Sequence, residues 1–436
     1  MIIAEVRLWG STIGAVSQED AQSVATFQYD PDFAKSGIEI SPIVMPLSDR
    51  IYQFPSLRAS TFHGLPGLLA DSLPDKFGNA LIDAWLATRD RSAESFGAVE
   101  RLCYIGTRGM GALEFKPTLG PKQRTATKVD IDALVQLASE VLTHRHNLRG
   151  HFRDEESDAL QDIVRVGTSA GGARAKAVIA WNPRTNDVRS GQVAADDGFE
   201  YWLLKFDGVS GNRDKELDDP EGYGAIEYAY HLMATAAGIT MTECRLLEER
   251  GRRHFMTKRF DRLAGGEKLH MQSLGALAHF DFNQAGAHSY EQAFRTIRQL
   301  ALPMSAVEEQ FRRMAFNVIA RNQDDHVKNI AFLMNKQGAW SLAPAFDVMY
   351  SYNPSGAWTA THQMTMNGKR DDFTMADFIA CARAALMKRG RAAAIVDEVT
   401  EAVKRWPKFA AKAKVPAGTA RKIQKVHRVT LLSTRP

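Results

Sequence analysis

Two short polar motifs separated by an apolar segment determine the fold of this chain. The first is RNQDDHVKN at residues 321–329, and the second is APAFD at residues 343–347. Between them, apolar runs at residues 330–334 and 340–342 flank a polar turn, which predicts a β-hairpin. Because a hairpin brings its two ends together, the two polar motifs should meet at one point.

The side chains of these motifs are the kind that phosphoryl transfer requires. Asp324, Asn329 and Asp347 offer carboxylate and amide oxygens, which are ligands suited to Mg²⁺. Protein kinases place an asparagine five positions after the catalytic aspartate, and Asp324 and Asn329 have this spacing. We therefore predict Asp324 as catalytic base and Asn329 and Asp347 as metal ligands. The alternative is a polar turn that ends one helix and starts a strand.

A kinase also needs a lysine that reaches the nucleotide phosphates, and Lys205 is the candidate. It lies in YWLLKFD at residues 201–207, a predicted strand with bulky apolar neighbours. A buried ammonium group is costly unless it is paired, and Glu227 on the following predicted helix is a candidate partner. The alternative is a lysine on an edge strand that extends to water.

A glycine-containing loop directly precedes another predicted strand, at residues 177–181. Residues 166–176 read VGTSAGGARAK, and small residues allow a backbone to approach phosphates closely. The loop does not follow the GxGxxG pattern, so a surface turn is an equal alternative. A second glycine cluster at residues 106–111 has no such partners around it, and we interpret it as a structural turn.

The pattern of the whole chain indicates an α+β protein with a β-rich first half and a mainly helical second half. We predict three parts: residues 1–118, residues 125–260 with the lysine strand, and residues 261–436 with the catalytic loop. Period-two alternation at Val6 and Leu8 is typical of strands. Helices are expected at residues 71–88, 130–145, 224–237, 289–300, 305–321, 373–387 and 391–405. A two-lobed fold around a cleft is compatible with this order.

Composition restricts the class of protein further. The chain has 436 residues, 44% hydrophobic and 24% charged, which is ordinary for a globular protein and excludes disorder. Three widely spaced cysteines favour a reducing compartment, the first strand is no signal peptide, and no apolar run spans a membrane. We therefore expect a cytoplasmic protein.

The formal charge of +4 is an average over two different parts of the chain. Residues 404–436, the basic C-terminal segment, contain ten Lys or Arg and no acidic residue, which leaves 45 basic against 51 acidic residues elsewhere. The segment is predicted either to contact nucleic-acid phosphates or to be a solvated helix face.

Taken together, these motifs resemble the HipA family, the serine/threonine kinase toxins of bacterial toxin–antitoxin modules. The resemblance covers nearly the whole chain in the family's order. The segments that carry it are residues 27–30, 41–47, 67–75, 104–113, 169–176, 201–207, 259–262, 324–329 and 346–347. It implies a two-lobed protein-kinase-like fold with a β-rich N-terminal subdomain.

The resemblance also implies roles for further residues, with ATP and Mg²⁺ as cofactors. Lys205 would contact the phosphates. The phosphate loop would consist of Ser169, Ala170, Gly171 and Gly172, and the adenine hinge of Lys258, Arg259 and Phe260. Asp261 would lie near the ribose and Gln272 near the nucleotide. Ser169 matches the serine whose autophosphorylation inactivates the kinase, which adds about two negative charges to a loop that surrounds phosphates. The neighbouring Thr168 is an alternative acceptor.

Two roles are open for His326, which lies between Asp324 and Asn329 as in phosphoinositide-type kinases: it orients Asp324, or it stabilises the transferred phosphoryl group. The sequence departs from the family at Arg174-Ala175, where Gln-Glu is usual, and at Lys258, where an acidic residue is common.

The resemblance implies a protein substrate, such as an aminoacyl-tRNA synthetase, and a helix-turn-helix antitoxin of the HipB type that brings the toxin to DNA. No membrane partner is expected. Two other functions remain: a DNA-bound co-repressor or interaction protein with little kinase activity, and a kinase for a lipid or small molecule.

Overall fold

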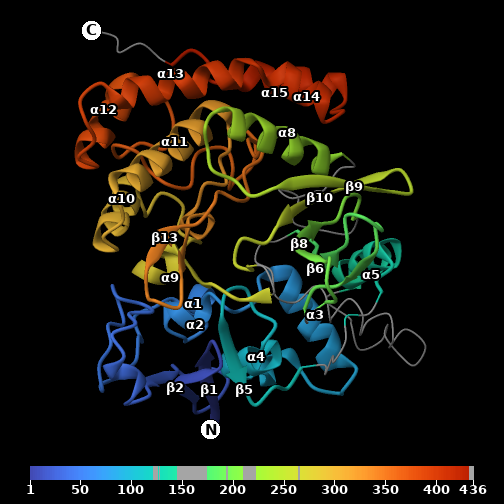
Figure 1. Ribbon diagram of the computed structural model, residues 1–436, viewed down its shortest axis with the longest axis vertical. Coiled ribbons are helices and arrows are strands. Elements are labelled where there is room, and N and C mark those ends of the chain that lie inside the picture. The colour runs from blue at the N-terminus through green and yellow to red at the C-terminus, as the bar shows by residue number, and fades with distance from the viewer. Residues whose placement is uncertain are drawn as a thin grey trace. The chain divides into compact units, whose positions relative to one another are not determined.

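The computed structural model describes residues 1–120, 126, 128–144, 174–192, 195–209, 222–263 and 266–431 (Figure 1). The chain forms two compact units, which are described separately. Unit 1 contains Met1–Glu221, Arg245–Gln272 and Met334–Ala339, and unit 2 contains Gly222–Cys244, Ser273–Leu333 and Trp340–Pro436. The sequence-based division into three parts is a separate subdivision of the chain, and it stays a prediction.

Unit 1 begins with a five-stranded antiparallel sheet of order β4-β3-β2-β1-β5. Its strands are β1 (Ile2–Leu8), β2 (Ser11–Gln18), β3 (Thr26–Tyr29), β4 (Ile51–Tyr52) and β5 (Leu113–Lys116). Val6 and Leu8 are buried while Arg7 between them is not, as the period-two alternation predicts. This sheet confirms the β-rich start of the chain.

Short helices lie in the connections that precede strands β4 and β5 in the sequence of unit 1. They are η1 (Phe33–Lys35), α1 (Ala59–Phe62), α2 (Gly67–Ala70), α3 (Lys76–Ala87), η2 (Ala93–Ser95) and α4 (Ala98–Ile105). The helix expected at residues 71–88 begins only at Lys76, with Asp75 in extended conformation as its N-cap. Pro74 explains the later start, because a proline disfavours helical conformation in the residue before it.

A second antiparallel sheet of unit 1, of order β7-β6-β8-β10-β9, contains the predicted lysine strand. Its strands are β6 (Lys176–Trp181), β7 (Val188–Ser190), β8 (Glu200–Lys205), β9 (Cys244–Glu249) and β10 (Arg252–Lys258). Helices α3 and α5 (Ile131–His144) share one apolar core with this sheet, in which Trp85, Val141 and Trp202 are buried. Strand β11 (His270–Ser273) belongs to unit 1 as far as Gln272, and unit 2 continues the sequence from Ser273.

Unit 2 is mainly helical, as the second half of the sequence predicts (Figure 1). Its helices are α8 (Tyr223–Ala236), α9 (Leu274–Ala278), α10 (Tyr290–Gln299), α11 (Met304–Ala320), η5 (Val327–Asn329), α12 (Met375–Ala384), α13 (Arg391–Lys404), α14 (Trp406–Lys412) and α15 (Ala417–Val426). The apolar stripe of α11, which includes Val307, Phe311 and Met314, is fully buried. The predicted hairpin is present as β12 (Ala331–Met334) and β13 (Trp340–Leu342).

The glycine cluster at residues 106–111 is a turn within unit 1. The backbone N–H of Gly111 donates a hydrogen bond to the Asp261 carboxylate over 2.7 Å, and Arg262 donates to the carbonyl oxygens of Gly109 and Gly111. A side chain at Gly111 would contact the backbone of Met271 at 3.0 Å. These contacts support the interpretation as a structural turn.

The basic C-terminal segment is not a solvated tail as far as residue 431. Trp406, Phe409 and Ile423 are buried, and the indole N–H of Trp406 donates to the carbonyl oxygen of Ala420 over 3.0 Å. Figure 1 shows α13, α14 and α15 beside α8 and α11. Apolar residues at helical spacing therefore fix this segment on unit 2, while most of its lysines and arginines stay exposed.

Candidate active site

The end of α11 determines where the catalytic loop begins. Arg321 adopts a left-handed conformation with φ +60° and terminates the helix. The next residue, Asn322, is tied back to the helix because its backbone N–H donates to the Asn317 carbonyl and its side-chain amide donates to Asn317 Oδ1, both over 2.9 Å. The polar motif therefore leaves the helix in a defined direction.

One serine orients the backbone of the loop. Ser351 Oγ accepts the backbone N–H groups of Gln323 at 2.7 Å and Asp324 at 3.0 Å, and its hydroxyl donates to Asn322 Oδ1 at 3.1 Å. The Ser351 hydroxyl thus forms hydrogen bonds with three consecutive loop residues. This leaves the side chain of Asp324 to point away from the loop.

Asp324 presents a carboxylate that is held at one oxygen and accessible at the other. The indole N–H of Trp358 donates to Asp324 Oδ1 over 2.7 Å, and His326 Nε2 lies 3.8 Å from the same oxygen. The side chain is 37% exposed. Both contacts fall on Oδ1, so among the described residues Oδ2 is the oxygen that can meet a substrate hydroxyl. This geometry is the one that a general base needs.

Asn329 is oriented by a hydrogen bond to the same loop. Its side-chain N–H donates to the backbone oxygen of Asp324 over 2.8 Å, and its backbone N–H donates to the His326 carbonyl over 2.9 Å. Because the amide nitrogen is used in this bond, the amide oxygen is the atom left to accept a cation. Asn329 therefore connects the loop to the pocket behind it.

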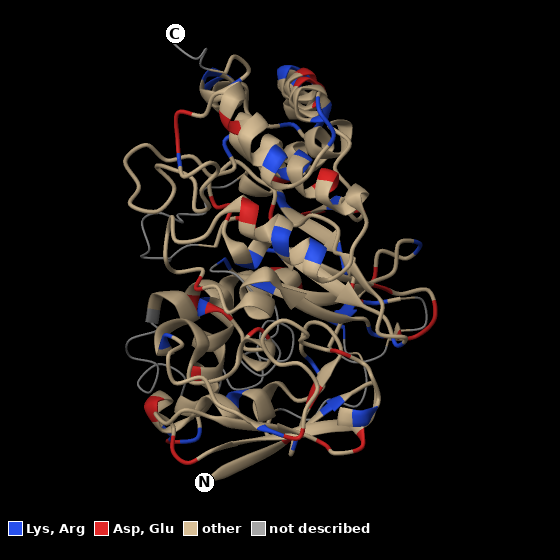
Figure 2. Ribbon diagram, turned by 90° about the vertical axis from the view of Figure 1, so that its left-hand side faces the viewer, with Lys and Arg blue, Asp and Glu red and all other residues tan. Residues whose placement is uncertain are grey.

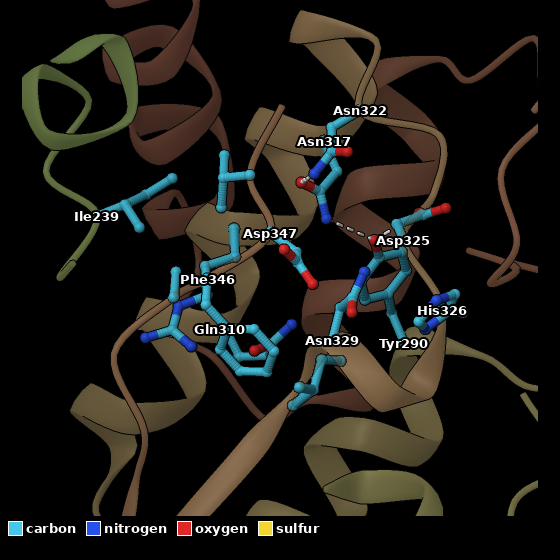
Figure 3. Close-up of a pocket in the computed structure, with 14 residues that line it drawn as sticks. Ile239, Tyr290, Gln310, Asn317, Asn322, Asp325, His326, Asn329, Phe346 and Asp347 are labelled. Carbon is cyan, nitrogen blue, oxygen red and sulfur yellow. Dashed lines mark hydrogen bonds between the residues drawn. The ribbon is translucent and has the colours of Figure 1, made fainter. Parts of the chain in front are cut away.

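Asp347 reaches the same pocket from the other end of the hairpin (Figure 3). It has φ +51°, a left-handed conformation. The preceding residues are fixed because the N–H of Ala345 donates to Thr240 over 2.8 Å and Arg313 donates to the carbonyl of Ala343 over 2.9 Å. Figure 3 shows the Asp347 carboxylate pointing into the pocket, on the side where Asn329 lies.

The pocket lies entirely within unit 2 and is lined by both polar and apolar residues. Its lining includes Gln310, Arg313, Asn317, Asn322, Asp325, His326, Asn329 and Asp347, with Ile239, Tyr290, Ile330, Ala345, Phe346 and Val348. Gln310 is buried, and its side-chain oxygen has no hydrogen-bond partner among the described residues. A buried polar atom without a partner is costly, which indicates that a ligand or water completes this pocket.

The donor set fits Mg²⁺ better than a transition metal. No group of three or more His, Cys, Asp or Glu that could hold a metal ion occurs in the part of the chain that the structure describes. Asn329 and Asp347 instead offer one amide and one carboxylate oxygen. Mg²⁺ is commonly bound by one or two carboxylates, with water and substrate phosphates as the remaining ligands.

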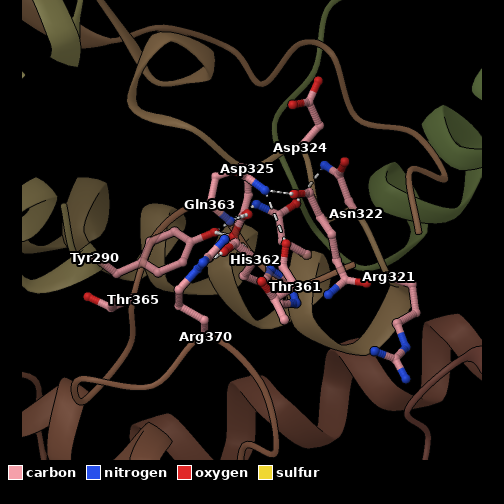
Figure 4. Close-up of polar contacts among 12 residues, drawn as sticks. Tyr290, Arg321, Asn322, Asp324, Asp325, Thr361, His362, Gln363, Thr365 and Arg370 are labelled. Atoms are coloured by element: carbon pink, nitrogen blue, oxygen red, sulfur yellow. Dashed lines mark hydrogen bonds and ion pairs between the residues drawn. The ribbon is translucent and has the colours of Figure 1, made fainter. Parts of the chain in front are cut away.

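Asp325, next to the predicted base, is the centre of a buried polar cluster (Figure 4). Its Oδ2 accepts from the Tyr290 hydroxyl at 2.6 Å and contacts His362 Nδ1 at 2.8 Å, while Oδ1 accepts from the backbone N–H of Gln363 at 2.7 Å. Its side chain is 1% exposed. Burial raises the pKa of Asp325, but the His362 contact and these hydrogen bonds outweigh it, so the pKa lies below its ordinary value.

Lys205 lies in the middle of the second sheet of unit 1. Its strand β8 has β6 on one side and β10 on the other, so the alternative of an edge strand does not apply. Lys205 is 4% exposed, and its ammonium group lies 5.8 Å from the centre of the Phe255 ring. The register places Lys176, which is 2% exposed, directly opposite Lys205. Glu227 belongs to unit 2, and its pairing with Lys205 stays a prediction.

The predicted hinge residues lie at the end of β10 in unit 1. Lys258 pairs with Glu200 over 2.6 Å. Arg259 and Arg262 both pair with the fully buried carboxylate of Asp261, at 2.6 Å and 2.8 Å. Burial raises the pKa of Asp261, but the two guanidinium groups outweigh it and hold the pKa well below its usual range. The side chains of Arg259 and Asp261 are thus engaged with each other.

Among the remaining predicted site residues, the structure describes some and not others. Gln272 is fully buried, and neither atom of its side-chain amide has a partner among the described residues, as expected for a side chain that awaits a ligand. Phe260 is the second residue after β10 and is partly buried. Ser169, Ala170, Gly171, Gly172 and Thr168 lie outside the described residues. The role of each of these residues stays a prediction.

Comparison with solved structures gives the fold. The chain is similar to HipA of Shewanella oneidensis MR-1, solved in a complex with HipB and its operator DNA, with a TM-score of 0.67 and 16% identity over 97% of this chain and 95% of that chain. The α+β, two-lobed protein-kinase-like fold is therefore confirmed. The proinflammatory kinase CtkA of Helicobacter pylori also matches, with a TM-score of 0.33 and 12% identity over 52% of this chain and 88% of that chain.

Comparison with family models then gives the family. Residues 4–116 match the HipA N-terminal domain, and residues 168–406 match the HipA-like C-terminal domain. The chain belongs to the HipA family, as its motifs predict, and it is a HipA-type, kinase-like transferase. No curated protein matches its sequence significantly.

Proposed function

We propose that this protein is an ATP- and Mg²⁺-dependent serine/threonine kinase of the HipA type, which acts as a toxin on a protein substrate in the cytoplasm. The observation that carries the proposal is the pair of motifs at the ends of the hairpin. Asp324 presents an accessible carboxylate oxygen, and Asn329 and Asp347 meet at one pocket close behind it. No helix in the described ranges is long and apolar enough to cross a membrane.

The residues divide the reaction between them. Asp324 Oδ2 would accept the proton of the substrate hydroxyl, while Trp358 keeps Oδ1 in place. Asn329 and Asp347 would hold Mg²⁺, which supplies charge stabilisation to the transferred phosphoryl group when bound. Lys205 would neutralise the nucleotide phosphates. His326, whose Nε2 lies 3.8 Å from Asp324 Oδ1, would orient that carboxylate.

Nucleotide binding beyond the phosphates would involve the end of strand β10 and strand β11. Lys258, Arg259 and Phe260 would contact the adenine, and the engagement of the Arg259 side chain with Asp261 favours backbone contacts there. Gln272, with both atoms of its buried amide unpartnered in the described structure, is suited to a nucleotide hydrogen bond. Asp261 would act near the ribose by fixing this segment.

Regulation would follow the family pattern. Autophosphorylation of Ser169 would add about two negative charges to the loop that would otherwise surround the ATP phosphates, and would so switch the kinase off. The Shewanella relative was solved with HipB and operator DNA. We propose an equivalent helix-turn-helix antitoxin as partner of this chain, with DNA reached through it.

A second candidate function is that of a DNA-bound co-repressor with little kinase activity. The observation that favours it is the group of exposed lysines and arginines from the end of α13 to the end of α15. Figure 2 colours the Lys and Arg positions of the ribbon blue. These are Lys404, Arg405, Lys408, Lys412, Lys414, Arg421, Lys422 and Lys425.

Phosphate transfer from ATP by the purified protein separates the two functions. We expect Asp324→Asn to lower kcat by at least about 100-fold, because a general base contributes that much. The exposed Asp397→Asn, which carries the same change on α13, is the control and should behave as wild type. Equal turnover by wild type and Asp324→Asn would contradict the kinase assignment and favour the co-repressor.

A further inference from the structure

We propose that Arg428, near the end of the described chain, is a positioning residue for the catalytic loop and acts on Asp324 through His362 and Asp325. The inference rests on the proposed function of Asp324 as general base. Arg428 belongs to the basic C-terminal segment, whose composition alone indicates only a charged surface. The proposal gives one residue of this segment a role in positioning the catalytic loop.

The chain of contacts starts at Asp325, the immediate neighbour of Asp324. Asp325 is fixed by three hydrogen-bond partners from two separate segments, namely Tyr290 on one and the neighbouring His362 and Gln363 on the other. The side chains of Asp324 and Asp325 point in different directions, and Figure 4 shows Asp324 away from this cluster. One peptide bond joins the two residues, so a rotation of Asp325 would move the Asp324 carboxylate. Asp325 itself is too buried to meet a substrate.

Arg428 holds His362 from the other side. His362 is fully buried, and its Nδ1 faces the Asp325 carboxylate, so Nδ1 carries the donated proton and Nε2 lies on the other side of the ring. Arg428 Nη1 lies 3.5 Å from this Nε2. A guanidinium group only donates, which favours the same tautomer. Removing Arg428 would leave the acceptor nitrogen of a buried imidazole without its partner.

Arg428 is itself fixed in place. Its backbone N–H donates to the carbonyl of Ile319, in the last turn of α11, over 2.8 Å, and its guanidinium pairs with Asp371. Its pKa is lowered to about 10, mainly by burial and further by the charge of Arg321. The folded protein therefore holds the guanidinium group of Arg428 in one position.

The residues just before Arg428 are anchored to the same helix end. Arg321, which terminates α11, donates through Nε to the carbonyl of Val426 over 2.9 Å. His427 Nε2 lies 3.1 Å from the hydroxyl of Tyr230, which donates to the carbonyl of Ala320 over 2.6 Å. The segment after α15 is thus attached to the residues from which the catalytic loop starts, and it ends with Arg428 directed at His362.

The test compares Arg428→Ala with Arg421→Ala, which removes the same side chain from an exposed position on α15. Phosphate transfer gives kcat and KM for ATP, and hydrogen–deuterium exchange of peptides covering residues 321–330 reports the loop without any substrate. We expect Arg428→Ala to lower kcat about tenfold, the effect of one hydrogen bond to a charged group, with KM for ATP unchanged. Loop exchange should become faster. Arg421→Ala should change neither.

Two further variants keep the test decisive if Arg428→Ala does not fold. Arg428→Lys retains a donor and should recover part of kcat and of the loop protection. Tyr290→Phe removes another hydrogen bond to Asp325 and should change kcat and exchange in the same direction as Arg428→Ala. Unchanged loop exchange in the folded variants would overturn the inference. So would equal losses of kcat in Arg428→Ala and Arg421→Ala.

The two readouts also separate this inference from the proposed function. If wild type transfers no phosphate while Arg428→Ala still accelerates exchange of the loop, the structural link is confirmed and the kinase assignment fails. If wild type is active and the exchange of residues 321–330 is insensitive to Arg428, the kinase assignment stands and the link fails.

Discussion

Trp358 donates the N–H of its indole ring to Oδ1 of Asp324 over 2.7 Å. The two residues are 34 positions apart, and Trp358 lies on a loop after the hairpin. That loop is fixed in turn because the Gln363 side chain donates to the carbonyl of Trp358. The contact therefore links the predicted base to a segment that contributes no other predicted site residue, and it determines which oxygen of Asp324 is accessible.

Replacing Trp358 by phenylalanine tests this contact, because phenylalanine retains the aromatic ring and removes the N–H. Without the donor the Asp324 carboxylate can rotate, and a hydrogen bond to a charged group contributes about 1.5–3 kcal/mol. We expect kcat for phosphate transfer to fall about 10- to 100-fold while KM for ATP stays constant. Trp340→Phe on β13 is the matched control. A kcat equal to that of wild type would show that Trp358 only packs.

Buried lysines of the second sheet give a prediction about nucleotide binding. Lys176 and Lys205 are directly opposite in the register of β6 and β8, so both side chains lie on the same face of the sheet. We expect Lys205→Met to weaken binding of Mg²⁺–ATP most, and Lys176→Met to weaken it less. Both lose a positive charge near the phosphates. Isothermal titration measures the affinity, and the exposed Lys116→Met is the control. Unchanged affinity in both variants would contradict a phosphate site at this sheet.

The sequence predicts the elements and the hairpin site well because these depend on local patterns. The five-residue spacing of Asp324 and Asn329 and the hairpin before Asp347 are local features, and the structure places Asn329 and Asp347 at one pocket. The support of the loop is not local. Asp325 takes its partners from segments up to 38 residues away, and no spacing in the sequence marks them.

The packing of the C-terminal helices could not be predicted from the sequence either. Their many lysines indicate a solvated segment, whereas Trp406, Phe409 and Ile423 are buried. Only tertiary packing distinguishes a basic tail from a basic surface of a packed helix. The Pro416 that precedes α15 and the short length of α14, Trp406–Lys412, also weaken the helical pattern in the sequence.

Buried histidines should make the protein sensitive to mild acid. Burial lowers the pKa of five histidines to about 4: His231, His254, His270, His279 and His427. In the unfolded chain each binds a proton below about pH 6.5. The unfolded state therefore binds more protons between about pH 6.5 and pH 4, and the free energy of unfolding falls as the pH falls through this window.

The slope of this dependence can be measured by denaturant unfolding at several pH values. Each histidine contributes up to about 1.4 kcal/mol per pH unit. We expect His270→Gln to reduce the slope by one such contribution, since it removes a titrating group that is fully buried beside the carbonyl of Ile40. A free energy of unfolding that is constant between pH 7 and pH 5 would contradict the prediction.

Ser169 gives a prediction about self-regulation. Incubation of the wild type with Mg²⁺–ATP should place a phosphate on Ser169, with Thr168 as the alternative acceptor, and kcat toward a protein substrate should fall as the phosphate accumulates. Ser169→Ala should stay active for longer, and Asp324→Asn should remain unphosphorylated. Mass spectrometry of the peptide that contains residues 166–176 measures the site. Phosphate found only elsewhere in the chain would reject this switch.

The exposed basic residues of α14 and α15 give a prediction about the DNA-bound complex. Truncation at residue 404 would not test them cleanly, because it also removes the buried Trp406, Phe409 and Ile423. Charge reversal at Lys408, Lys412 and Arg421 leaves this core intact.

If these side chains neutralise DNA phosphates, each lost contact reduces the dependence of log K on log salt concentration by about 0.9. We therefore expect the triple reversal to lower this slope by up to about 2.7 for binding to operator DNA in the presence of the antitoxin. Reversal of Lys35, Arg50 and Lys116, which are exposed on unit 1, changes the net charge equally and is the control. Equal slopes for wild type and both triple variants would mean that the basic helices only face solvent. Equal reductions in both variants would indicate a general effect of net charge.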